Sequence, residues 1–353
     1  MEKKVVARRD LIIAALAVAV LAVGIVLALL LDGRRDGKPL SAHYFDLFNS
    51  DLSVITDYSG DGEEKFRERC AAVSEVLNYY NKLFDIYNEY EGMTNAATVN
   101  RLAGSEEVRV PRELIDFLVF SKELYVITEG KTNVAMGAVL KLWHDAREHG
   151  TLHPADAKIP EMNALTEAAK HCDIEKLVID EAECTVRFLD PGMSLDLGAV
   201  GKGYATEMAA RRLEQGGADA IVLEVGGNVR IIGEKPSGKG IKTGIQNPDL
   251  MSDDRYVFTL ELKDTSAVTS GSYQRFYTAS GVKYHHIIDP DTLMPSEGFA
   301  SVTVIVKDSG LADGLSTALF SMTYEEGVRV LQGVDGARAV WVTPSGELLF
   351  YGI

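Results

Sequence analysis

Apolar and polar positions divide this chain of 353 residues into parts with different periodicities. The first part is the segment 11–31, an apolar run without a charged residue. A helix rises by about 1.5 Å per residue, so this run is long enough to cross a hydrocarbon layer of roughly 30 Å. Four cations precede the run and three follow it closely, which orients it only weakly. We predict a cytoplasmic N-terminus over 1–10, a transmembrane signal anchor over 11–31, a polar linker over 32–43 and one extracytoplasmic domain over 44–353.

Within that domain, the first half has the spacing of amphipathic helices and the second half the spacing of strands. The expected helices are 64–91, 111–128, 134–147, 160–171, the run that follows Leu197 and ends at Gly216, 311–322 and 325–331. The expected strands are 176–180, 185–189, 193–197, 220–225, 256–262, 267–270 and 300–306, with hairpins over 275–288 and 337–351. This order of elements predicts an α+β protein.

Composition and charge narrow the function classes. The chain is 46% hydrophobic and 25% charged, as in an ordinary globular protein. Its formal net charge of −16 argues against a nucleic-acid partner, because nothing would offset phosphate repulsion. The cysteines Cys70, Cys172 and Cys184 lie far apart without a C-x-x-C pair. The sequence therefore indicates neither a zinc site nor a disulfide framework.

The segment from Asp196 to Leu213, DLGAVGKGYATEMAARRL, has the glycines, the lysine and the helical run of a phosphate-binding loop. A triphosphate loop would need a glycine where Asp196 stands and a hydroxyl where Gly203 stands, so this is not a P-loop. Glycine N–H groups, the positive end of the helix and Lys202 can still bind a phosphate. On these residues alone, a phosphate site and a plain strand-to-helix turn with a surface lysine remain open.

Four further segments follow in the second half: EVGGNVRIIG from Glu224, AVTSGSYQRFY from Ala267, YHHIIDP from Tyr284 and LADGLSTALF from Leu311. Together with the segment at Asp196, they resemble the ApbE family, the FAD:protein FMN transferases, in order and spacing. The resemblance implies a T-fold-like mixed sheet core with flanking helices. It also implies a Mg²⁺-dependent enzyme that splits FAD at its pyrophosphate, transfers FMN to a threonine or serine hydroxyl of an acceptor protein and releases AMP.

The resemblance assigns roles to residues of these segments. Asp196 and Lys202 correspond to FAD contacts, with Lys202 also placed in the catalytic centre. His286 corresponds to the general base, although a lone strand histidine is more often structural. Asp313 and Thr317 share one helix face and would bind Mg²⁺, although an aspartate here is more commonly a helix N-cap. The other expected magnesium ligands are the carbonyl of Ala199 and the side chain of Ser316, which replaces an acidic residue found in some members. The other expected FAD contacts are Gly226, Gly227, Thr269, Ser270, Gly271 and Ile287.

The N-terminal half departs from the family pattern. Where the family has a hydrophobic–Gly–Thr strand at the flavin, this chain has Phe48-Asn49-Ser50. A family glutamate is replaced by Asn95, and an aromatic residue and an aspartate are replaced by Thr132 and Asn133. The loss of carboxylates predicts a changed affinity or nucleotide preference. The expected FAD contacts in this half are Phe48, Ser50, Asn95, Thr132 and Asn133.

Acceptor proteins of the family carry the motif D-x-x-[ST]-[GS]-A-[ST], which this sequence lacks. The expected partner is therefore a separate acceptor, a membrane or exported electron-transfer flavoprotein. Two other interpretations remain at this stage. One is an FAD pyrophosphatase that uses water as the nucleophile, and the other is a non-catalytic flavin-binding protein at the membrane. The altered N-terminal contacts favour the binding protein, whereas the intact metal and lysine segments favour an enzyme.

Overall fold

The computed structural model describes residues 38–44, 53–273 and 275–353. The predicted anchor at 11–31 and the predicted FAD contacts Phe48 and Ser50 lie outside these ranges. No helix within them is both long and apolar enough to span a membrane.

The centre of the fold is an eight-stranded sheet in which every neighbouring pair of strands is antiparallel. The strand order is β1-β2-β6-β7-β10-β13-β14-β15. All six residues of β13 are buried, because the sheet is covered on both faces at its centre. The strands are β1 Leu40–Tyr44, β2 Ser53–Asp57, β6 Ile221–Val225, β7 Asn228–Ile232, β10 Ser266–Gly271, β13 Ser301–Val306, β14 Arg338–Val342 and β15 Leu348–Tyr351.

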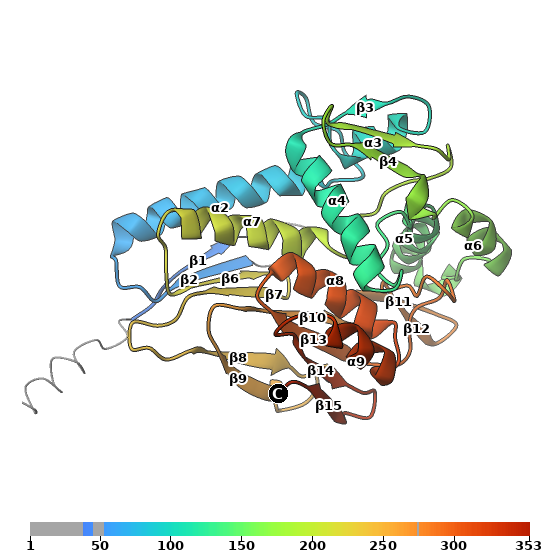
Figure 1. Ribbon diagram of the computed structural model, residues 1–353. Coiled ribbons are helices and arrows are strands. Elements are labelled where there is room, and N and C mark those ends of the chain that lie inside the picture. The colour runs from blue at the N-terminus through green and yellow to red at the C-terminus, as the bar shows by residue number, and fades with distance from the viewer. Residues whose placement is uncertain (1–37, 45–52, 274) are drawn as a thin grey trace, which may run out of the picture.

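Helices cover one face of the sheet and a hairpin covers the other (Figure 1). The helical layer contains α2 Glu63–Leu83, α7 Gly201–Gln215, α8 Ser309–Phe320 and, beside α8, α9 Tyr324–Gln332. The hairpin on the opposite face consists of β8 Ile241–Gln246 and β9 Tyr256–Leu262. Its Ile241 and Leu262 pack on Ile231, Ala267 and Ile305 of the sheet. Side chains at alternate strand positions therefore enter different cores.

A second group of elements extends from the helical layer, at the upper right of Figure 1. The hairpin β11–β12 comes from the second half of the chain but packs against α5 in this group. Its shared core contains Trp143, Tyr277 and Ile288. The elements are α3 Ala96–Leu102, β3 Val108–Arg109, α4 Arg112–Ile127, α5 Gly137–Leu152, α6 Met162–Ala169, β4 Leu177–Asp180, β5 Thr185–Phe188, β11 Phe276–Ala279 and β12 Val282–His285, with 3₁₀ turns at Pro154–Asp156 and Ile174–Lys176.

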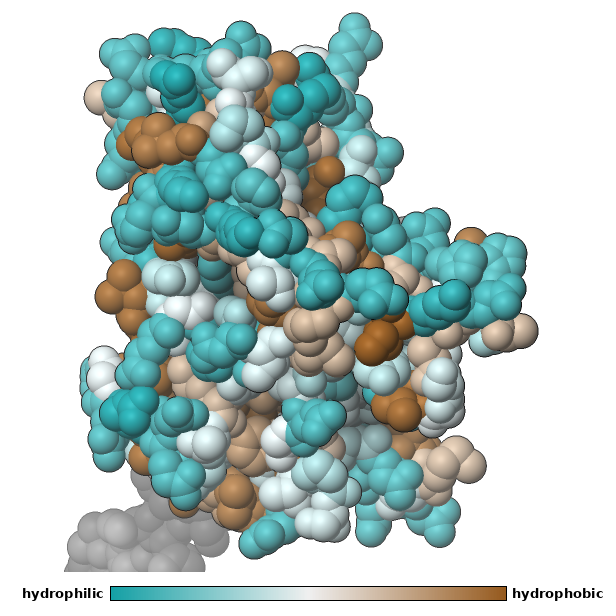
Figure 2. Space-filling view, turned by 90° about the vertical axis from the view of Figure 1, so that its right-hand side faces the viewer, coloured by the Kyte–Doolittle hydropathy of each residue, from teal (hydrophilic) through white to brown (hydrophobic). Residues whose placement is uncertain are grey.

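On the face shown in Figure 2, hydrophilic residues prevail and apolar residues lie scattered among them. This distribution is that of an ordinary solvated surface.

Three expected elements differ from the observed ones. The helix expected over 134–147 is α5, which begins and ends later, at Gly137–Leu152. The helix expected over 64–91 ends at Leu83. The carboxylate of Asp85 accepts hydrogen bonds from the N–H groups of Tyr87 and Asn88, and this local turn replaces helical bonding. The strand expected over 193–197 is wrong, since this stretch is a loop whose one ladder contact is the bridge between Ser194 and Met136. The loop leads directly to the functional site.

Candidate functional site

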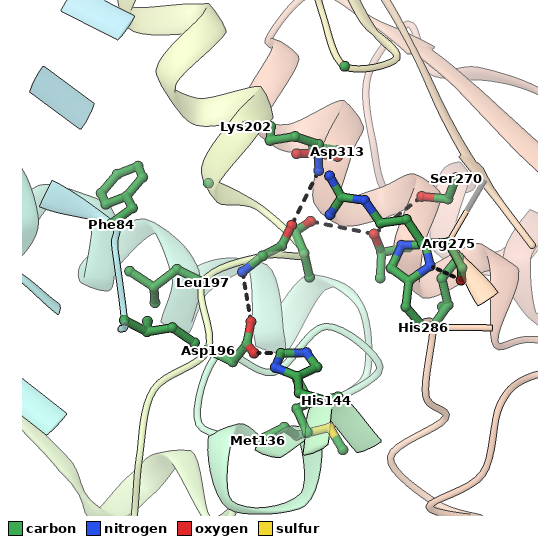
Figure 3. A pocket seen from close by; sticks show the side chains of 18 of the residues that line it. Phe84, Met136, His144, Asp196, Leu197, Lys202, Ser270, Arg275, His286 and Asp313 are labelled. Carbon is green, nitrogen blue, oxygen red and sulfur yellow. Dashed lines mark hydrogen bonds and ion pairs between the residues drawn. The ribbon is translucent and has the colours of Figure 1, made fainter. Parts of the chain in front are cut away.

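A cavity of about 480 Å³ lies where the N-terminal end of α7, the middle of α8, α5, the turn after α2, the end of β10 and the segment after β12 meet. Its size is that of a nucleotide-scale ligand pocket. Figure 3 shows its side chains converging from these separate elements. Among the predicted site residues, the lining includes Thr132, Asn133, Asp196, Ala199, Lys202, Gly226, Thr269, Ser270, Gly271, His286, Ile287, Asp313 and Thr317.

The loop before α7 forms one wall of the cavity. The Asp196 carboxylate accepts a hydrogen bond from the N–H of Gly198 at 2.9 Å. One turn further on, the Lys202 ammonium donates to the carbonyl of Gly198 at 3.4 Å. The positive end of α7 and the Lys202 charge therefore face the same space, which favours an anionic group there.

Helices α7 and α8 cross at a glycine. The N–H of Gly203 donates to the Asp313 carboxylate at 2.8 Å. A Cβ at position 203 would overlap both the carbonyl of Ser309 and the Cβ of Asp313, so only glycine permits this approach. Asp313 is 4% exposed. Burial raises the pKa of its carboxyl group, while the Lys202 charge and the Gly203 N–H act in the opposite direction.

Oxygen atoms gather beside Asp313. The Thr317 hydroxyl donates to the Ala199 carbonyl at 3.4 Å and lies 3.3 Å from the Ser270 hydroxyl. Ser316 is fully buried behind them, 2.8 Å from the Ser270 hydroxyl, and donates to the Asp313 carbonyl at 3.0 Å.

This donor set contains one carboxylate, a backbone carbonyl and hydroxyls. Within the described ranges, no group of three or more His, Cys, Asp or Glu side chains is placed to hold a metal. Hard oxygen donors around a single carboxylate fit Mg²⁺, which keeps several waters and takes further oxygens from phosphates. Asp313, Thr317 and the Ala199 carbonyl would hold it. Ser316 does not face the cavity, because its hydroxyl is bonded to Ser270 and to the Asp313 carbonyl.

His286 follows β12 and stands beside Arg275, on the same side of the view as Ser270 (Figure 3). Its Nδ1 is 3.2 Å from the carbonyl of Arg275. A carbonyl can only accept, so Nδ1 carries the proton and Nε2 keeps a lone pair. Burial, followed by the charges of Arg275 and Lys202, lowers the pKa of His286 to about 3. The imidazole is therefore neutral with a free lone pair on Nε2, and the lowered pKa makes it a weak base in the empty cavity.

Further cavity residues were not among the predicted contacts, although Arg275 lies within the segment that starts at Ala267. These residues are Tyr87, Lys131, His144, Arg147 and Arg275. His144 and Arg147 lie three apart on α5 and so face the same side of that helix. No local sequence signal identifies them, because the packing of α5 decides which of its side chains face the cavity. The two arginines add positive charge to a lining that also contains Asp85, Asp196 and Asp313.

Three predicted contacts do not line the cavity. Asn95 is fully buried as the N-cap of α3, where its side chain accepts from the Thr98 N–H and donates to three backbone carbonyls. Gly227 lies in the turn between β6 and β7, and Ser316 is buried behind the oxygen atoms described above. Thr132 and Asn133 reach the cavity, but their side chains are bonded to the protein. Thr132 donates to Gly314 and Asn133 to Cys172.

The arrangement defines an α+β protein with a cavity suited to a phosphate-bearing nucleotide. A cation at a helix N-terminus, a buried carboxylate with hydroxyls, and a neutral histidine share one space. Phosphoryl transfer needs these groups: positive charge for the phosphates, oxygen ligands for a metal, and a base for the nucleophile.

Comparisons identify the family. The model of the ApbE family matches residues 51–341. An FAD:protein FMN transferase of Treponema pallidum is 31% identical over 288 residues, covering 78% of this chain and 77% of the relative. One of Klebsiella pneumoniae is 29% identical over 280 residues, covering 79% and 84%. The crystal structure of the ApbE protein from Thermotoga maritima matches with a TM-score of 0.77 at 27% identity, covering 89% of this chain and 97% of that one.

The chain therefore belongs to the ApbE family. Its mixed α+β fold is the fold of the solved ApbE structures, and its family membership makes it an enzyme of the transferase class.

Proposed function

We propose that this protein transfers the FMN moiety of FAD to a threonine or serine hydroxyl of an acceptor protein and releases AMP. The observation that carries the proposal is the convergence of Lys202, Asp313, Thr317 and His286 on one cavity of nucleotide size. The relatives named FAD:protein FMN transferase support FAD as the substrate. Asp196, Thr269, Gly271 and Ile287 would contact the nucleotide along the same walls.

In the proposed reaction, the acceptor hydroxyl oxygen attacks the phosphorus of the FMN half of FAD. A new P–O bond forms to the acceptor while the bond from that phosphorus to the bridging oxygen breaks. AMP leaves with the bridging oxygen. His286 Nε2 takes the hydroxyl proton, because its Nδ1–H is held by the Arg275 carbonyl. Lys202 stabilises negative charge on the pyrophosphate as it shifts towards the leaving group.

Magnesium is part of this proposal. When bound, Mg²⁺ neutralises the pyrophosphate and favours charge build-up on the transferring phosphoryl group. The Asp313 carboxylate must be ionised to bind it. The Gly203 N–H and the nearby Lys202 favour that ionised form against the effect of burial.

We further propose that the acceptor is supplied in trans, carries the motif D-x-x-[ST]-[GS]-A-[ST] and is a membrane or exported electron-transfer flavoprotein. The apolar run at 11–31 supports a single-pass anchor that holds the catalytic domain on the extracytoplasmic side. Protease protection of the C-terminal domain in intact cells would test this topology. Digestion of the domain from the outside is expected, and full protection there would contradict it.

The function is tested by incubating the purified protein with FAD, Mg²⁺ and an acceptor bearing the motif. Flavin fluorescence should remain on the denatured acceptor band and vanish when the motif threonine is replaced by alanine. Asp313→Asn should lower the labelling rate by roughly 100-fold or more, because the ionic metal ligand is lost. The matched control is Asp335→Asn, at an exposed aspartate between α9 and β14. Normal labelling by Asp313→Asn would refute the metal assignment.

A further inference from the structure

His144 stands between two walls of the cavity (Figure 3). Its Nε2 is 3.7 Å from the Asp196 carboxylate, and its Nδ1 is 2.7 Å from the Tyr87 hydroxyl. The His144 side chain is 25% exposed and that of Asp196 is 9% exposed, so the contact is largely removed from solvent. Three segments distant in sequence are linked in this way: the turn after α2, helix α5 and the loop before α7.

The two neighbours determine the tautomer and the protonation state of the His144 imidazole. A carboxylate beside Nε2 favours the tautomer with its proton on Nε2, so Nδ1 accepts a hydrogen bond from the Tyr87 hydroxyl. Burial lowers the pKa of His144, while the Asp196 charge opposes that shift. The ring is thus neutral, with one nitrogen turned to each partner.

Asp196 is held on both sides by this arrangement. One carboxylate oxygen accepts from the Gly198 N–H at 2.9 Å, and the other faces His144. With a hydrogen bond on one oxygen and the imidazole beside the other, the carboxylate has fewer orientations available before a ligand enters. A preoriented acceptor binds a donor with less loss of side-chain entropy than a free one.

We propose that His144 is a positioning residue that orients Asp196 toward an N–H or O–H donor of FAD bound in this cavity. The proposal rests on the proposed function. Tyr87 completes the chain: the residue is 64% exposed, and its hydroxyl links the turn after α2 to α5. His144 acts on the substrate only through Asp196, so its loss affects FAD binding before it affects the chemical step.

The test measures the Kd for FAD by quenching of flavin fluorescence, together with KM and kcat of the transfer reaction. His144→Ala should raise Kd and KM by roughly tenfold, the cost of ordering one side chain on binding, with kcat nearly unchanged. His144→Gln should restore most of the affinity, because its amide N–H can reach Asp196. His144→Asn should not, since its shorter amide reaches only Tyr87.

Tyr87→Phe provides a second and independent variant at an exposed position. It should raise Kd in the wild-type background and have no further effect in the His144→Ala background, since the chain is already broken there. The matched control is His149→Gln, an exposed histidine on the same helix, which should bind FAD as the wild type does.

The possible results distinguish failure of the positioning role of His144 from failure of the proposed function. Wild-type affinity in His144→Ala, or equal losses in His144→Ala and His144→Gln, would overturn the positioning role while FAD binding by the wild type still stands. Failure of the wild-type protein itself to bind FAD would overturn the proposed function and the positioning role with it.

Discussion

Replacement of Gly203 by alanine tests whether the crossing of α7 and α8 sets the catalytic geometry. The added methyl group would overlap the carbonyl of Ser309 and the Cβ of Asp313. The two helices must then move apart or shift along each other. Lys202, next to the mutated residue, and Asp313, across the crossing, would both leave their present positions.

The expected magnitudes follow from opposing terms. Alanine is about 1 kcal/mol better than glycine within a helix. Forcing an extra methyl group into a packed crossing costs about 1–3 kcal/mol. One of the overlapping atoms is a backbone carbonyl, which cannot rotate away, so we expect a net loss of about 1–2 kcal/mol in the free energy of unfolding. A displacement of the catalytic groups by about 1 Å costs roughly 100-fold in rate, so the loss of activity should far exceed the loss of stability.

Urea denaturation measures the stability, and the rate of flavin attachment to the acceptor measures the activity. Gly333→Ala is the matched control, because its Cβ would meet only the Val330 carbonyl, at 3.4 Å, at the C-terminal end of α9. It should retain both wild-type stability and wild-type rate. A Gly203→Ala protein that transfers flavin at the wild-type rate would refute the argument that this crossing positions the site.

Two further predictions concern single side chains. The pKa of His286 is lowered to about 3 from roughly 6.5 in an unfolded chain, so its contribution to stability is present above pH 6.5 and is lost as the pH falls from 6.5 towards 3. Between pH 7 and pH 5, the wild type should therefore lose up to about 2 kcal/mol more of its free energy of unfolding than His286→Gln loses, both measured without FAD by urea denaturation. Equal losses in the two proteins would contradict the lowered pKa of His286. Asn95→Ala should lower the free energy of unfolding by about 1–2 kcal/mol, since it removes a helix cap and the amide that donates to the carbonyls of Lys82, Asp85 and Asn88, of which the first two keep another donor. A loss below about 0.5 kcal/mol would show that the Asn95 side chain does not stabilise the start of α3 and the turn after α2.

Regular periodicity made much of the fold predictable from the sequence. The helix expected over 111–128 is α4, at Arg112–Ile127, and the hairpins expected over 275–288 and 337–351 are β11–β12 and β14–β15. Strand β7 was missed even though Gly226-Gly227 is a two-residue hairpin signal. Both glycines have positive φ, and β6 pairs with β7 across them. The two glycines were interpreted as a place where the backbone approaches a ligand, whereas they form the turn of the β6–β7 hairpin.

The candidate site was predictable where a residue's role follows from its motif. Asp196, Lys202, His286 and Asp313 all reach one cavity, although they come from segments far apart in the chain. The sequence could not show which way a polar side chain faces. Asn95 points into the supporting structure rather than the cavity, because the turn after α2 needs its amide. His144 enters the site only through the packing of α5, which no local pattern specifies.

The most direct test of the central claim is the ratio of AMP released to FMN attached in a single reaction with acceptor in excess. High-performance liquid chromatography measures the AMP, and intact mass spectrometry of the acceptor measures the attached FMN. Flavin transfer at this site predicts one AMP for each FMN attached, with both products dependent on Mg²⁺ and on Asp313. AMP with free FMN and an unmodified acceptor would show a hydrolase, and FAD bound without either product would show a binding protein. Either result would contradict flavin transfer as the function of this site.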